Sequence, residues 1–347
     1  MPRQDELKHR QDQRKLRLDE VQPFTYTFGV ELEFVSRFGY QATASIIKTR
    51  YEAKYCEDLV LTYEGYNHNN HNGNDAPWKL VSDASINSHN YAVGCELVSP
   101  ILEGMLGFEK LLRVVNILET LSDEDKFGVN KSCGLHVHLG TQHMTPEEVK
   151  KFATNYVRSE SAMDLLVPKS RRHKGHNGYC ASNVKNIALN DGDNESHVAV
   201  SKAMETITNL KFSKNQTKQQ KLDLLSSVFS TRFLKLNLSS LYHTSHKTME
   251  VRHFGGTLNE AKIGGWLQTL DYMYRMSRTQ VAFKVPSSDR NCEAKGNFRR
   301  LSAWFDGDKT VQDWAKGRKK ELEQADARQR RNARRRANYS NNRNNAS

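Results

Sequence analysis

Four segments of this 347-residue chain alternate apolar and ionisable residues with a period of two, and this repeated pattern constrains the fold more than any other feature. In residues 133–140, His136 and His138 alternate with three aliphatic side chains. Side chains two residues apart lie on the same face of a β-strand. The segment therefore predicts a strand with both imidazoles on one face and an apolar opposite face.

Residues 24–34 show the same division near the start of the chain. Glu31 and Glu33 share one predicted face, and aromatic and aliphatic side chains form the other. Two glutamates in this arrangement are also typical of a solvent-facing sheet edge, so this strand alone leaves both readings open.

The other two segments are predicted hairpins. The first joins residues 78–83 to 94–100 and carries Asp83 and Glu96. Asp83 is equally compatible with a turn residue, and Glu96 with a surface glutamate. The second joins residues 232–241 to 247–255. Glu250 and Arg252 share one face of its last strand, an arrangement that surface neighbours also adopt.

Helices are expected over residues 107–121, 145–166, 195–211, 215–230 and 260–284, where apolar residues recur at spacings of three and four. Thr145 and Glu148 form a capping-box pattern at the start of one of them. In the region 36–76, residues 67–75 are interpreted as a polar loop, in which His68 and His71 receive no role. The predicted class is α+β: an antiparallel sheet with helices packed on its apolar face.

Charge divides the chain unevenly. The net charge is +12, but residues 316–347 hold eleven Lys/Arg and three Asp/Glu, so 11 − 3 = +8 lies in this segment. We predict a charged extension over 1–22, a catalytic domain over 23–315 and a disordered, Asn/Arg-rich basic tail over 316–347. The tail either keeps the protein soluble or binds nucleic acid or another acidic surface.

The compartment is expected to be the cytoplasm. No run of 18 apolar residues predicts a membrane span, and the first residues lack the apolar segment of a signal peptide. The five cysteines are scattered and form no Cys-x-x-Cys pair, so reduced thiols are expected.

A shared polar face would crowd carboxylates that repel one another unless protons or cations neutralise them. Oxygen-rich ligation with one or two imidazoles favours Mg²⁺ or Mn²⁺ over zinc. Arg252 would suit a phosphate, because its planar fork matches phosphate oxygens. The chain contains no P-loop, Rossmann glycine fingerprint, His-Glu-x-x-His or Gly-x-Ser-x-Gly motif, so any nucleotide is expected on the sheet itself.

Four ordered motifs resemble those of the amidoligase family, carboxylate-amine ligases related to glutamine synthetase and glutamate-cysteine ligase. They are residues 28–34, the pair 83–85 and 96–100, residues 133–138, and residues 250–252 before 256–258. The resemblance spans about residues 24–280. It implies a glutamine synthetase-like sheet that holds ATP and Mg²⁺, on which a carboxylate is phosphorylated and an amine attacks the acyl phosphate.

The resemblance also implies residue roles. The expected metal ligands are Glu31, Glu33, Asp83, Glu96, His136 and Glu250. The expected nucleotide contacts are His138, Arg252 and Arg232, and Arg252 and Glu250 are the expected catalytic residues. The family pattern also includes an arginine and a Tyr-Cys element, which Arg172 and residues 179–180 could supply.

Three functions follow. The first is an ATP- and Mg²⁺-dependent ligase that joins small-molecule or peptide carboxylates to amines. The second is a metal-dependent phosphoryl transferase or hydrolase on the same acidic sheet. The third is a nucleic-acid-associated protein that acts through its tail while the sheet is vestigial. Retention of the whole charged set weighs against the third, since unused buried carboxylates destabilise a sheet.

Overall fold

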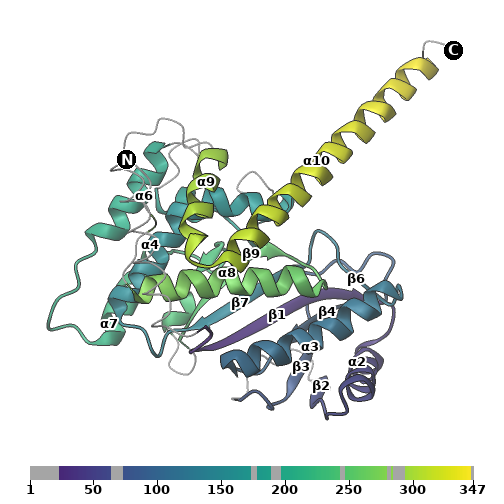
Figure 1. Ribbon diagram of the computed structural model, residues 1–347, viewed down its shortest axis with the longest axis horizontal. Coiled ribbons are helices and arrows are strands. Elements are labelled where there is room, and N and C mark those ends of the chain that lie inside the picture. Colours follow the sequence, from purple (N-terminus) through teal and green to yellow (C-terminus); the bar gives the residue numbers. More distant parts are fainter. Residues whose placement is uncertain are drawn as a thin grey trace.

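The computed structural model describes residues 23–63, 73–172, 178–188, 197–242, 247–279, 283 and 294–344. Within these ranges the chain forms one sheet and a set of helices, so the expected α+β class is confirmed (Figure 1). The strands are β1 (Thr27–Ser36), β2 (Leu61–Tyr63), β3 (Trp78–Ser82), β4 (Val93–Val98), β5 (Leu102–Glu103), β6 (Phe127–Gly128), β7 (Gly134–Gly140), β8 (Leu236–Asn237) and β9 (Thr248–Gly255).

The α-helices are α2 (Tyr40–Tyr55), α3 (Gly104–Asp123), α4 (Pro146–Met163), α5 (Asn183–Ile187), α6 (His197–Asn209), α7 (Lys218–Ser227), α8 (Glu260–Arg278), α9 (Ala294–Trp304) and α10 (Lys309–Asn344). Short 3₁₀ turns are η1 (Asp164–Leu166), η2 (Lys169–Arg171), η3 (Ser239–Tyr242) and η4 (Phe305–Gly307). The predicted capping box is present: Thr145 accepts from the Glu148 backbone N–H, and the Glu148 side chain accepts from the Thr145 N–H.

The sheet runs in the order β2-β3-β4-β1-β7-β9-β8, and β5 and β6 also pair with β1. Both predicted hairpins form, although β8 has only two residues. The strands pair antiparallel except at one edge, where β2 and β3 are parallel. The expectation of an all-antiparallel sheet is wrong there. Residues 64–77 separate these two strands, and a connection of a dozen or more residues permits a parallel crossover.

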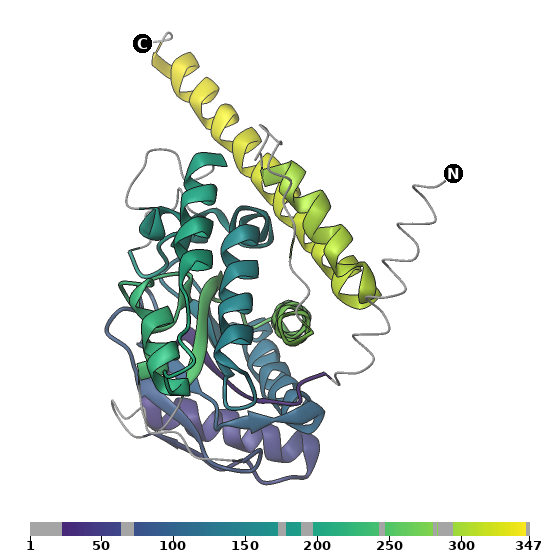
Figure 2. The ribbon, with the colours of Figure 1, turned by 90° about the vertical axis from the view of Figure 1, so that its left-hand side faces the viewer.

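The apolar face of the sheet is the core of the molecule. Phe28, Val30 and Leu32 of β1 are at most 2% exposed and belong to one continuous cluster with residues of α3, α4 and α8. Helices α3 and α8 lie over this face (Figure 1), and Figure 2 looks down the axis of α8. Because the helices cover one face, the ionisable side chains that alternate with the core residues lie on the other.

Two segments differ from the expectations. Helix α2 lies in a region for which the sequence predicted no helix, and it buries Thr43, Ala44, Ile47 and Tyr51. Two of these are small or polar, so the apolar stripe is weak in the sequence. His68 and His71 lie outside the described residues.

The basic segment predicted to be disordered is helical, because α10 continues through it to Asn344. The first turns of α10 bury Val311, Ala315 and Leu322 against the body, which gives the helix a packed origin from which to propagate. Among the described helices, none combines the length and the apolar character needed to cross a bilayer.

Candidate functional site

The polar face of the sheet gathers the predicted carboxylates. Glu33 on β1 pairs in register with Glu96 on β4, and both side chains are buried at 4% and 5% exposure. Glu31 pairs with His136 on β7. Residues directly opposite one another on antiparallel strands project from the same face, so the register alone brings these groups together.

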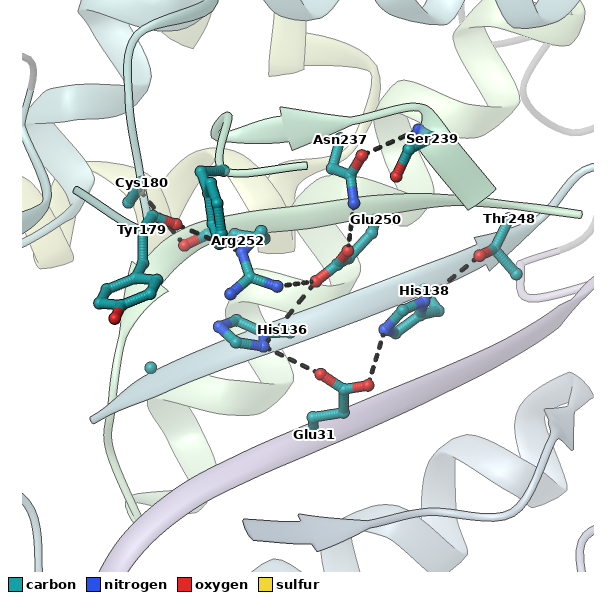
Figure 3. Close-up of polar contacts among 12 residues, drawn as sticks. Glu31, His136, His138, Tyr179, Cys180, Asn237, Ser239, Thr248, Glu250 and Arg252 are labelled. Carbon is teal, nitrogen blue, oxygen red and sulfur yellow. Dashed lines mark hydrogen bonds and ion pairs between the residues drawn. The ribbon is translucent and has the colours of Figure 1, made fainter. Parts of the chain in front are cut away.

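Glu31 contacts both histidines of β7 (Figure 3). Its Oε2 lies 2.9 Å from Nδ1 of His136, and its Oε1 lies 3.1 Å from Nε2 of His138. The other ring nitrogen of His136 is 3.3 Å from Glu33 Oε1, while that of His138 faces Thr248 at 3.2 Å. The two imidazoles therefore share one carboxylate but have different second partners.

Glu250 on β9 closes the cluster on the other side of β7. It lies opposite His138 in register, and its Oε1 is 2.5 Å from an Arg252 guanidinium nitrogen. Asn237 of β8 donates to Glu250 Oε2 at 2.6 Å. The Nε of Arg252 donates to the Tyr179 carbonyl at 3.3 Å, so the guanidinium is held at the edge of the carboxylates (Figure 3).

The ligand atoms fall into three groups whose members lie within 4.8 Å of one another. The groups are Glu31/His138/Glu250, Glu31/Glu96/His136 and Glu33/Asp83/Glu96. Glu31 belongs to two groups and Glu96 to two, so the sites adjoin. The structure thus brings together all six residues predicted as metal ligands, and it places His138, predicted as a nucleotide contact, beside them.

The pKa values record how strongly the groups interact. Burial raises the pKa of Glu96 well above its usual range, and three neighbouring carboxylates raise it further. Burial also raises the pKa of Glu31, but His138 and His136 outweigh it and hold this pKa well below its usual range. Burial lowers the pKa of His138, yet the Glu31 carboxylate overcomes this and raises it to about 9. Opposed shifts of this kind are typical of functional sites.

The sequence singled out Arg172 and gave no individual role to its neighbour Arg171, which lies at the same face. Its side chain is buried, donates to the Cys133 carbonyl at 2.6 Å and forms no ion pair with a carboxylate of the described residues. A Cβ at Gly134 would lie 2.8 Å from an Arg171 nitrogen and 2.9 Å from Nε2 of His136. Glycine at this position therefore lets the Arg171 guanidinium approach His136. The backbone N–H of Gly134 also donates to Glu33 at 2.6 Å.

Two further residues of the polar face were missed. Lys79 of β3 pairs in register with Val98, which is itself opposite Glu31, and the lysine is 2% exposed. The sequence does indicate this position of Lys79, because the residue stands between the apolar residues Trp78 and Leu80 in an alternating pattern. For Asn237, the signal was the alternation of leucines in residues 234–238.

Two predicted arginines lie apart from the cluster, whereas the Tyr-Cys element contacts Arg252 at its edge. Arg232 is exposed, with its guanidinium 5.1 Å from the centre of the Phe233 ring, so its role toward a nucleotide stays a prediction. Arg172, suggested for the family's arginine, instead donates to the Val167 carbonyl and pairs with Asp326 of α10 at 3.3 Å. Cys180 of the Tyr-Cys element contacts the Arg252 carbonyl at 3.4 Å.

Fold and site define an α+β protein with an acidic, histidine-bearing sheet face flanked by arginines. Comparison with known families agrees with the resemblance found in the sequence. The model of the family described as "Putative amidoligase enzyme" matches residues 25–273, more than half of the chain. The chain belongs to this family. No curated protein matches the sequence.

Proposed function

We propose that the protein is an ATP- and Mg²⁺-dependent carboxylate-amine ligase that acts on small-molecule or peptide substrates through an acyl phosphate. The observation that carries the proposal is the set of three adjoining ligand groups on one sheet face, with Arg252 at their edge. The family model supports a ligase-type enzyme. A glutamine synthetase-like sheet is part of the same proposal.

The donor set fits hard divalent cations. Five carboxylates and two imidazoles supply mainly oxygen, the ligand that Mg²⁺ and Mn²⁺ prefer. Burial and the neighbouring carboxylates raise the pKa of Glu96, because ionising all of these groups together is unfavourable, and bound cations would offset that repulsion. When bound, these ions would neutralise charge on the nucleotide phosphates.

Two guanidinium groups are suited to the transferred phosphoryl group. Arg252 is oriented by Glu250 and by the Tyr179 carbonyl, with 17% of its side chain exposed toward solvent. Arg171 is a buried cation without a carboxylate partner among the described residues, a state that is costly unless an anion compensates it. An anionic ligand over Gly134 would supply that compensation.

The proposed reaction proceeds in two displacements. A carboxylate oxygen of the first substrate attacks the γ-phosphorus of ATP, the bond to the bridging oxygen breaks, and ADP leaves. The amine of the second substrate then attacks the acyl carbon, inorganic phosphate leaves, and the nitrogen loses a proton to give the amide. In the first step Arg252 would stabilise the negative charge on the phosphoryl oxygens.

The test is an incubation with ATP, Mg²⁺ and pools of amino acids, polyamines and carboxylated acceptors, with ADP, phosphate and new product masses as readouts. Glu250→Ala should abolish turnover. Glu109→Ala, an exposed glutamate of α3, should leave it unchanged as the matched control. ATP loss that never requires a paired amine and carboxylate would overturn the ligase and favour the phosphoryl transferase or hydrolase.

A further inference from the structure

Helix α10 consists of two parts with different surroundings. Its first part, residues 309–326, docks on the body: Trp314 donates its indole N–H to the Ala261 carbonyl at 3.1 Å, and Arg318 lies 5.5 Å from the centre of the Phe254 ring. The second part, residues 327–344, projects away from the body (Figures 1 and 2). We call the second part the projecting half.

Charge separates at the same point. The acidic residues of α10 all lie in the docked part and are ion-paired: Asp313 with Lys309, Glu321 with Lys262, Glu323 with Lys319, and Asp326 with Arg172. From residue 327 to the last residue the sequence has seven arginines and no Asp, Glu or Lys. The projecting half therefore carries cations that no carboxylate of its own stretch can balance.

The arginines surround the helix. Arg328, Arg330, Arg331, Arg334, Arg335 and Arg336 are all exposed. At about 100° per residue they point to every side of the helix, so they do not form the single stripe expected of a face that packs on a neighbouring helix. Pairs such as Arg330 and Arg334, four residues apart, repel by a few tenths of a kcal/mol. A polyanion would reverse that repulsion.

We propose that the projecting half binds nucleic acid through the phosphodiester backbone, as a function separate from the ligase site. Arginine is the only cation used, and its fork binds phosphate in a bidentate manner and stacks on bases, whereas general attraction to an acidic surface is served equally by lysine. The sequence of the projecting half also contains five asparagines, and amides of this kind can bond base edges. An α-helix about 10–12 Å wide fits the major groove of B-form DNA, which is about 12 Å wide and has phosphates along both sides.

The test uses the full chain and fluorescence anisotropy with three labelled probes: a 20-base-pair DNA duplex, an RNA hairpin and a polyglutamate peptide. Contact with about six phosphates of duplex DNA predicts a log–log salt slope near −5. Substituting Arg334, Arg335 and Arg336 together with Gln should reduce this slope by about 3 and weaken binding at least about 100-fold near 100 mM salt.

The matched control removes the same charge elsewhere. Lys185→Gln, Lys211→Gln and Lys214→Gln, combined in one chain, change exposed lysines outside α10 and should alter affinity by less than about threefold. Preference for one nucleic-acid probe identifies the source of the phosphodiester. Equal affinity for polyglutamate, no binding to either nucleic acid, or identical losses in both triple variants would overturn the proposal. Circular dichroism should show that the arginine variant retains its helix, and ATP turnover should be unchanged.

Discussion

Nε2 of His138 lies 3.1 Å from Oε1 of Glu31, and the histidine side chain is 24% exposed. His136 contacts the other oxygen of the same carboxylate but is only 4% exposed. The enclosed imidazole can reach little besides a cation within the cluster, whereas the open one can also reach a larger ligand.

We therefore predict that His136→Ala weakens Mg²⁺ binding at least about tenfold, and that His138→Ala chiefly raises the KM for ATP. Calorimetry with Mg²⁺ alone and steady-state kinetics at saturating Mg²⁺ separate the two effects. Equal losses of metal affinity in both variants would show that His138 is itself a metal ligand.

Magnesium should stabilise the protein by relieving repulsion around Glu96. At a free concentration 100 times the Kd, one site adds about 2.7 kcal/mol to the free energy of unfolding, and chelation should remove this gain. Glu96→Gln should leave Tm unchanged or raise it in the absence of metal, because the amide replaces a carboxyl whose ionisation is already disfavoured by burial and its neighbours, and it should reduce the gain with Mg²⁺. Glu109→Gln should behave as wild type in both conditions. A Glu96→Gln protein that gains as much as wild type would exclude Glu96 as a ligand.

Arg252→Lys keeps the charge but loses the planar fork that contacts both Glu250 and the Tyr179 carbonyl. We expect kcat to fall about 100-fold with a normal Tm. Arg232→Lys provides the comparison, since Arg232 is exposed over Phe233. A rise in the KM for ATP in the Arg232 variant would support the role predicted for it from the sequence.

Arg171→Gln removes a buried cation that has no carboxylate partner among the described residues. Because the charge is costly to bury, we expect Tm to stay the same or rise, while kcat/KM falls at least about tenfold. Inorganic phosphate should raise the Tm of wild type and not that of the variant. Loss of stability together with unchanged kinetics would make Arg171 a purely structural residue.

Beneath the sheet, His253 gives stability a pH dependence. Its ring lies 2.6 Å from Asp164 and 2.9 Å from the Tyr156 hydroxyl, and Lys235 and Glu160 belong to the same buried network. Burial and then Lys235 lower the pKa of His253. The folded state therefore disfavours the protonated ring, and stability is lost as pH falls below the unfolded value of about 6.5.

The free energy of unfolding should keep falling until the pH reaches the pKa of His253 in the folded state. It should fall by about 1.4 kcal/mol for each pH unit between the unfolded and the folded pKa. His253→Gln cannot titrate. We expect its free energy of unfolding, measured with urea between pH 7.5 and 5, to fall less than that of wild type. Parallel curves for the two proteins would assign the pH dependence to other groups.

The polar face was predictable because strand alternation and antiparallel register are local rules. Glu31, Glu33 and Glu250 could be assigned to one surface as soon as their strands were recognised. Alternation cannot predict the partner of each group, because the partner depends on which distant segments pair. Glu31 contacts both histidines, and Asn237 from a two-residue strand donates to Glu250, and neither contact follows from a local pattern.

Arg171 shows a second limit. Two adjacent arginines are equivalent in sequence, and only the 3₁₀ turn η2 directs Arg171 toward Gly134 and Arg172 toward α10. Helix α10 shows a third limit. Its Arg/Asn composition is typical of disorder, but the buried residues of its first turns outweigh that composition.

The docking of α10 also fixes the geometry of whatever its far end holds. Arg318 lies on the ring of Phe254, two residues beyond Arg252 on β9. At about 1.5 Å per residue, the 18 residues from 327 to 344 extend about 27 Å. The helix thus acts as a stiff spacer anchored on the strand that carries Arg252. A nucleic acid bound at its end would sit at a set radius from the sheet, confining the enzyme's product to the neighbourhood of that nucleic acid.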